Sequence, residues 1–316
     1  MAKTGTLGDK IFRTVLLIFA STILITVVAM IVMLVWNSMP TIRQFGIAFL
    51  FEDKWLPASS IYGALPFIYG TIVSSLIALI IAVPLSLGIA IFLVEQAPKK
   101  IATPIAFLVE LLAAIPSVVY GLWGIFVLAP FIRNYLGAFL AQYFGWIPLF
   151  QASLNESGTI SSGIGMFAGG LIMALMITPI ITAVVRDVLE VVPTQQREAA
   201  LALGATKWET TKIVLGNAAS GIAGAIVLGL GRALGETMAV TMVIGNSPEI
   251  SASLFEPAYT IASVLAANFA EATDKLYLSA LIEMGLVLFL VTFVVNGFAK
   301  LLVARVARGS GTAKAT

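Results

Sequence analysis

Six long runs of apolar residues dominate this sequence, and they restrict the chain to one class of fold. Each run exceeds the roughly 20 residues that an α-helix needs to cross a bilayer. Backbone N–H and C=O groups find no water in lipid, so such a run forms a helix. Only 11% of the residues are charged, against about 25% in soluble domains. The sequence therefore predicts an all-α membrane protein with six transmembrane helices. The predicted spans are 15–36, 66–94, 101–132, 163–185, 218–245 and 275–303.

These spans divide the chain into four parts. A basic N-terminal segment, 1–14, precedes the first transmembrane helix and its following loop, 15–65. A five-helix domain, 66–306, contains the polar loop 193–217, and a basic tail, 307–316, ends the chain.

Lysine and arginine predict the orientation of the chain in the membrane. Six spans place both chain ends on one side. That side carries 13 of the 18 Lys and Arg residues, the opposite side carries four, and Arg232 lies within a span. Because positive loops stay in the cytoplasm, both termini and the loop 193–217 are expected to be cytoplasmic. The outer loops hold seven acids against four bases, so they would repel a dissolved anion rather than attract it.

Missing residue types and motifs exclude several functions. The chain has no cysteine and no histidine, which excludes disulfides, His/Cys metal sites and a histidine-based catalytic triad. No phosphate-binding Walker A sequence is present, so the chain is not itself an ATPase. Its net charge of +2 is too small to suggest nucleic-acid binding. An intramembrane enzyme stays as an alternative to a transport subunit, but no paired acids at a useful spacing support it.

The loop between the fourth and fifth spans is expected to form a pair of short helices. Thr194 is a candidate N-cap, and the residues after it are good helix formers. Gly204 is expected to end the first helix, because glycine readily adopts the left-handed conformation. Thr206 and Glu209 have the spacing of a capping box, so a second helix is expected from there to Gly216. An ordinary interhelical loop is the alternative interpretation.

The sequence Glu198-Ala199-Ala200, followed after three residues by Gly204, resembles the EAA loop of permease subunits of ATP-binding-cassette importers. The family pattern then continues with Ile-x-Leu-Pro, where this chain has Val-Leu-Gly-Asn at 214–217. In that family, the loop docks in a groove of a cytoplasmic ATPase and transmits its closure to the membrane helices. The resemblance implies that this contact involves Arg197, Glu198, Ala199, Ala200, Gly204 and Ala205.

A charged pair lies inside the predicted fifth span. Arg232 is the fifteenth residue of the run 218–245, about 21 Å along a helix, near the bilayer midplane. A charge there costs roughly 2.5–3.5 kcal/mol and needs a partner. Glu236 follows one helical turn later on the same face. The pair either only holds helices together or contacts an anion. Glu110 and Glu283, in the third and sixth spans, either share Arg232 or reach water.

The third span contains candidate helix breaks. Pro104, Pro116 and Gly121 are expected to bend it, and the loop after it is expected to begin at Arg133. A break near Ser117 and Tyr120 would free backbone polar groups, which the membrane tolerates where protein or a cavity covers them. We therefore place Ser117 and Tyr120 with Arg232 and Glu236 on a candidate substrate pathway, with simple kinks as the alternative.

The run Gly-Leu-Gly-Arg-Ala-Leu-Gly-Glu-Thr-Met at 229–238 resembles permeases of phosphate-specific transporters, the PstC type more than the PstA type. The resemblance extends over about 15–305 and includes Ala-Ile-Pro-Ser-Val-Val-Tyr-Gly at 114–121. It implies the type I ABC importer permease fold, phosphate as cargo, and a multi-pass protein of a bacterial or archaeal plasma membrane.

The same resemblance implies partners for the chain. These are a second permease subunit of the PstA type, a dimer of ATP-binding subunits and a periplasmic phosphate-binding protein. The chain would also contact membrane lipid, and no nucleic-acid partner is expected. ATP and Mg would belong to the ATPase partner, and no cofactor to this chain. A permease for another anion, such as sulfate or molybdate, or for a small polar solute is the alternative function.

Overall fold

The computed structural model describes residues 7–152 and 154–311, and it confirms the helical membrane class. Within these residues, six helices are long and apolar enough to cross a membrane. The only β-pairings in the same residues are isolated bridges. The candidate spans are Gly8–Phe45, Leu65–Gln96, Ser117–Phe144, Met166–Val191, Lys207–Leu234 and Lys275–Leu301.

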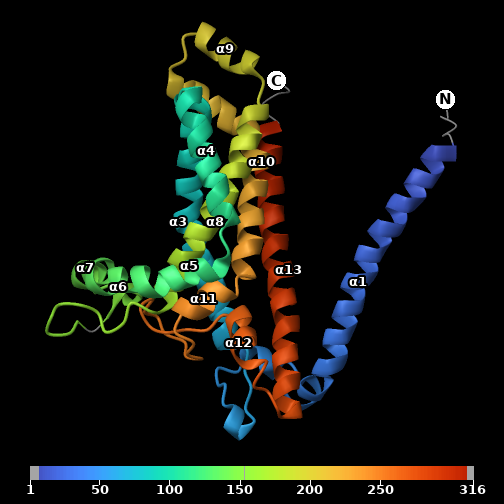
Figure 1. Ribbon diagram of the computed structural model, residues 1–316, viewed down its shortest axis with the longest axis vertical. Helices are drawn as coiled ribbons and strands as arrows, with labels where there is room; N and C mark the ends of the chain where they lie inside the picture. Colours follow the sequence, from blue (N-terminus) through green and yellow to red (C-terminus); the bar gives the residue numbers. More distant parts are fainter. Residues whose placement is uncertain (1–6, 153, 312–316) are drawn as a thin grey trace.

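Four long helices form the bundle, with α8 at its centre (Figure 1). They are α3 (Leu65–Ile91), α8 (Met166–Val191), α10 (Lys207–Leu234) and α13 (Lys275–Gly311). In α8, 72% of the membrane-length window is buried, more than in any other described candidate span. Gly170 of α8 allows close packing, because a Cβ there would lie 2.6 Å from the Ile77 side chain of α3.

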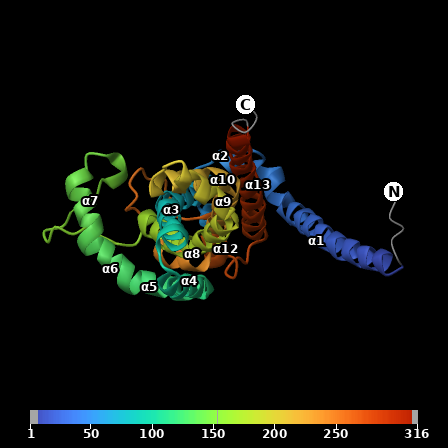
Figure 2. The ribbon, with the colours of Figure 1, turned by 90° about the horizontal axis from the view of Figure 1, so that it is seen from above.

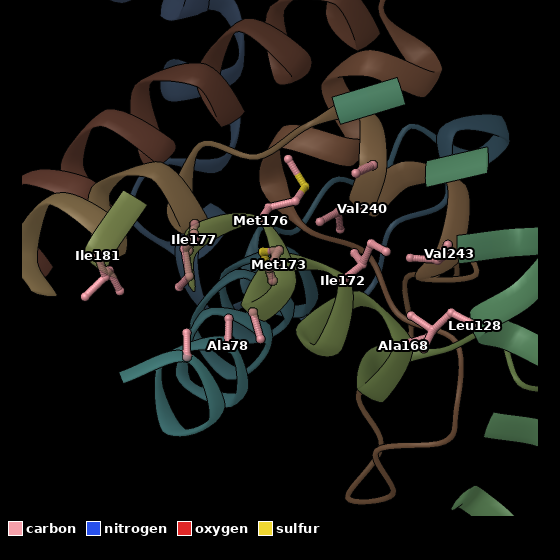
Figure 3. Close-up of a cluster of buried hydrophobic side chains, with 14 of the residues drawn as sticks. Ala78, Leu128, Ala168, Ile172, Met173, Met176, Ile177, Ile181, Val240 and Val243 are labelled. Carbon is pink, nitrogen blue, oxygen red and sulfur yellow. The ribbon is translucent and has the colours of Figure 1, made fainter. Parts of the chain in front are cut away.

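The main hydrophobic core is centred on α8. Figure 3 shows Ile172, Met173 and Ile177 of α8 among side chains from the neighbouring helices, which include Ala78 of α3 and Val240 of α11 (Met238–Val243). A second cluster joins the loop 46–64 to α3, α12 (Ile261–Asn268) and α13. This loop contains the four-residue helix α2 (Ala48–Phe51) and a short 3-10 helix at Pro57–Ser59, both far too short to cross a membrane.

The first helix, α1 (Leu7–Phe45), leans away from the bundle and contacts it mainly near its end (Figures 1 and 2). There Thr41 Oγ1 donates a hydrogen bond to Ser279 Oγ of α13 at 2.7 Å. None of the membrane-length window of α1 is buried within this chain. Its apolar side chains therefore form a surface suited to lipid or to another protein.

The predicted third span is bent sharply at Pro116. Helix α4 (Lys99–Ala114) runs along the bundle, and Ile115 and Pro116 end it. From Ser117, α5 (Ser117–Trp123), α6 (Ala129–Phe131) and α7 (Gly137–Phe144) are joined by π-helical segments and run across the long helices (Figure 1). Pro104 and Gly121 lie inside α4 and α5, so neither breaks the helix in which it lies. The boundary at Arg133 is also wrong, because one exposed arginine does not interrupt an otherwise apolar helix.

The segment that follows α8 also differs from the sequence expectation. Helix α10 continues through Gly216 and Asn217, because this chain has Asn217 where the importer pattern has a proline, and a glycine costs only about 1 kcal/mol in a helix. The predicted fifth span instead ends at Leu234, with Gly235 as C-cap, and resumes as α11. Thr237 Oγ1 donates to the Gly235 carbonyl at 3.1 Å, a side-chain bond that competes with helical pairing.

Candidate functional site

Two helix breaks border a pair of packed short helices. One lies between α4 and α5, the other between α10 and α11, and α5 packs against α11. Gly121 makes this packing close, because a Cβ on it would lie 3.2 Å from the Cα of Ala239. Ser117 and Tyr120 lie in the first turn of α5, and Glu236 lies two residues before α11. The fold therefore brings residues separated by more than 100 positions in sequence into one region.

Hydroxyl groups and a cation meet in this region. The Tyr120 hydroxyl donates a hydrogen bond to the carbonyl of Leu112 at 2.9 Å, a group that lies in the last turn of α4 before the break. Arg232, in the last turn of α10, interacts electrostatically with Tyr120. Ser117 and Tyr120 are half-buried and Arg232 is exposed in the isolated chain. The arrangement places the Tyr120 hydroxyl within electrostatic reach of the Arg232 charge.

Arg232 and Glu236 do not form the self-contained ion pair that their spacing allows. In the described chain, neither side chain makes a salt bridge. The helix ends between them, so the one-turn spacing no longer places them on a common face. The Glu236 Oε1 atom accepts a long hydrogen bond, 3.5 Å, from the backbone N–H of Ala239. The hypothesis that this pair only holds helices together therefore has no support in the geometry.

The two other acids within the spans are not partners of Arg232 either. Glu110 of α4 forms a salt bridge with Arg186 of α8 at 2.9 Å. Glu283 of α13 is 6% exposed, and its Oε2 has no hydrogen-bond partner among the described residues. The positive charge of Arg232 is therefore left without a carboxylate partner in the part of the chain that the structure describes.

The loop 193–217 contains the predicted helix, α9 (Thr194–Ala202), which projects beyond the ends of α3, α4 and α8 (Figure 1). The N-cap is Pro193 rather than Thr194, since the Pro193 backbone has an extended ψ of 134° and Thr194 is already helical. Gly204 has a φ of +85°, as expected. The capping box is also confirmed: Thr206 Oγ1 accepts from the Glu209 N–H, and the Thr206 N–H donates to Glu209 Oε2.

The residues of the EAA-like motif point in two directions. Glu198, Ala199 and Gly204 are exposed, and no atom lies within 4 Å of a Cβ placed on Gly204. Ala200 is buried and accepts a hydrogen bond from the N–H of Ala205. The exposed group forms an outward surface at the tip of the loop, while Ala200 packs inward.

Arg197 is turned toward the membrane helices. It forms a salt bridge with Glu95 at 2.8 Å, at the end of the helix that contains α3. It also donates hydrogen bonds to the carbonyls of Val192 and Leu189 at 2.6 and 2.9 Å, next to and within the last turn of α8. Sequence reasoning missed this role for Arg197 and missed Glu95 entirely. The two residues are 102 positions apart, and only the isolated acid at the end of the second span offered a signal.

Comparison with known proteins adds the family context. Residues 82–308 match the family described as binding-protein-dependent transport system inner membrane component. A relative in Xylella fastidiosa (strain Temecula1), named phosphate transport system permease protein PstC, is 45% identical over 96% of this chain and 93% of its own length. A probable phosphate transport system permease protein PstC in Methanocaldococcus jannaschii is 38% identical over 83% and 82% of the two chains.

Among solved structures, a chain of the MetNI methionine ABC transporter in inward-facing conformations is similar. It is 17% identical with a TM-score of 0.48, covering 77% of this chain and 94% of that chain.

Proposed function

Since the chain belongs to the family of binding-protein-dependent transport system inner membrane components, we propose that it is the membrane-spanning permease subunit of an ATP-driven phosphate importer. The names of relatives that are 38–45% identical over most of this chain support phosphate as the cargo. The observation that carries the proposal is Arg232, a cation without a carboxylate partner in the described chain, beside two helix breaks.

The pathway residues have separate roles in this proposal. A phosphate ion loses water as it enters the membrane, and the fixed charge of Arg232 offsets part of that cost. The hydroxyls of Ser117 and Tyr120 replace hydrogen bonds to water. Glu236 competes with phosphate for Arg232 and returns the pathway to its empty state. The acid is close in sequence but is not bonded to Arg232 here, which suits an alternating partner.

Coupling to ATP hydrolysis would pass through α9. Its outward surface, formed by Glu198, Ala199 and Gly204, would contact the ATPase. Arg197 links α9 to the end of the helix that contains α3, through Glu95, and to α8, through the Leu189 carbonyl. A hydrogen bond of 2.6 Å from Asn217 to Gln196 ties it to α10. A movement of α9 would therefore be transmitted to three helices of the bundle.

The remaining parts of the transporter would come from partners. A second permease subunit of the PstA type completes the pore, a dimer of ATP-binding subunits binds ATP and Mg, and a periplasmic phosphate-binding protein delivers the cargo. This chain would hold no cofactor. With α9 facing the ATPase, the N-terminal end of α1 and the C-terminal end of α13, which lie at the same end of the molecule as α9 (Figure 1), would be cytoplasmic. The exposed face of α1 would contact lipid or the second permease.

Uptake by the reconstituted complex tests the proposal. Proteoliposomes that contain both permeases and the ATPase, with ATP at the ATPase side and the binding protein at the other, are expected to accumulate labelled phosphate. Omission of this chain should abolish uptake. Uptake of sulfate or of a polar organic solute, with none of phosphate, would contradict the assignment and favour the alternative cargo.

Gly204→Val is expected to uncouple the transporter while leaving the chain inserted in the membrane. A side chain in the left-handed conformation costs roughly 1–2 kcal/mol, and a β-branched one would displace the tip of the loop. Phosphate uptake by the variant complex should fall severely. Gly216→Val is the matched control, since Gly216 is also exposed with open space around it but lies inside α10. Equal uptake by the two variants would argue against a docking role for Gly204.

A further inference from the structure

A basic cleft with a volume of about 520 Å³ lies between α8, α10 and α13. Three polar side chains line it, namely Arg232 of α10 with Asn296 and Lys300 of α13. The rest of its wall is apolar and comes from α8 and α10, with Gly231 beside Asn296. Asn296 and Lys300 are four residues apart and share one face of α13. The space that these three residues line is called the basic cleft.

The charges of the basic cleft are not compensated by this chain. No acidic side chain lines it, and neither Arg232 nor Lys300 forms a salt bridge within the described residues. Arg232 and Lys300 are both exposed in the isolated chain, so water or an anion can compensate charges that would otherwise be costly in a membrane. The cleft is therefore positively charged and open to an anion.

Asn296 also lacks a partner among the residues that the structure describes. Its amide makes no hydrogen bond within the described chain, and its Oδ1 is buried without a partner. Polar groups in such positions are nearly always satisfied, because an unpaired one destabilises the fold. An apolar residue would fill this position at lower cost. A phosphate group gives both ends of the amide a role, because a P–OH group donates to the buried Oδ1 and an unprotonated oxygen accepts from the amide nitrogen.

We propose that the basic cleft binds a phosphate-group oxyanion, with Arg232 and Lys300 supplying charge and the Asn296 amide donating a hydrogen bond. The cleft extends from Arg232 toward the end of the bundle that carries α9, because Lys300 lies near that end of the α13 span (Figure 1). This inference rests on the proposed function. Phosphate that has passed Arg232 would next meet Lys300, so the basic cleft would be a binding site on the exit side of the pathway.

The same chemistry has two possible sources, free inorganic phosphate and the phosphate of an anionic lipid headgroup. The experiment uses the complex of permeases and ATPase, without the binding protein, in two kinds of nanodisc. Nanodiscs of phosphatidylcholine alone are incubated with labelled inorganic phosphate to measure binding. Nanodiscs that also contain phosphatidylglycerol are analysed for the lipid retained by the purified complex.

Lys300→Gln is expected to weaken phosphate binding about tenfold or more, the effect of losing one charged hydrogen-bond donor. Lys300→Arg should bind nearly as well as the wild type, and Asn296→Leu should be weaker. Lys275→Gln is the matched control, a lysine at the other end of the same helix, and should leave binding unchanged. If the source is lipid, Lys300→Gln instead lowers the retained phosphatidylglycerol and leaves phosphate binding unaltered, which supports the same site with a headgroup as its ligand.

Unchanged phosphate binding and unchanged lipid retention in Lys300→Gln would overturn the inference. That result is distinct from failure of the proposed function, which is measured as phosphate uptake by the wild-type complex. If the complex transports phosphate but Lys300→Gln changes neither phosphate binding nor lipid retention, the proposed function holds and the proposed binding site is wrong. A complex that transports only another solute loses the function, and the lipid measurement still decides the site.

Discussion

Exchanging the two charges, Arg232→Glu with Glu236→Arg, is expected to abolish phosphate uptake although the complex still assembles. The exchange would preserve an ion pair between the two positions if there were one, but the described structure contains no such pair and the helix ends between them. It would also move the cation past the helix break, away from its place near Tyr120. Because preorganised contacts to a charge contribute factors of about 100 to 1,000, uptake should fall at least about 100-fold.

Single variants refine this prediction. Arg232→Lys keeps the charge and loses the planar guanidinium, so it should retain little uptake. Glu236→Gln should disturb the transport cycle more than assembly. Arg133→Gln, the change of an exposed arginine outside the pathway, is the control and should transport normally. Assembly is checked by copurification of all subunits. Full uptake by the exchanged protein would show that the pair only holds helices together.

Arg197→Ala is expected to have the largest effect on coupling and stability together. The variant leaves Glu95, whose side chain is only 10% exposed, without its ion-pair partner, and removes donors from two carbonyls at the end of α8. Breaking such a buried pair by removing one partner costs about 3–5 kcal/mol. The thermal midpoint of the complex should fall, and ATP hydrolysis should lose its dependence on transported solute.

A second substitution separates these two effects. The double variant Arg197→Ala with Glu95→Ala removes the unpaired carboxylate, so it should recover part of the stability. It should stay uncoupled, because α9 is no longer tied to α3 and α8. Normal coupling in the double variant would contradict the role given to Arg197. Arg197→Lys should be intermediate, since lysine restores the charge but not the set of directed hydrogen bonds.

Features set by local chemistry were predicted well from the sequence. The apolar runs indicated the membrane class, because the bilayer leaves the backbone few alternatives to a helix. Gly204 and the capping box of Thr206 with Glu209 were also predicted correctly, since each depends on residues within one turn. The bend at Pro116 follows from the same kind of local constraint.

Features that depend on distant contacts were not predicted. An apolar run contains no sequence signal that shows where its helix is interrupted. The end of α10 at Leu234, which separates Glu236 from the helix, could therefore not be predicted from residue spacing. The direction of α5 depends on its packing against α11. The inward orientation of Arg197 depends on Glu95, which the sequence places in another span.

Substrate-dependent ATP hydrolysis by the reconstituted complex tests the account most directly. The complex contains this chain, the second permease and the ATPase, with the binding protein added, and hydrolysis is measured with phosphate and with sulfate. The account predicts that phosphate stimulates hydrolysis and sulfate does not, and that Gly204→Val removes the stimulation. Equal stimulation by sulfate, or no stimulation by phosphate in the wild-type complex, would contradict it.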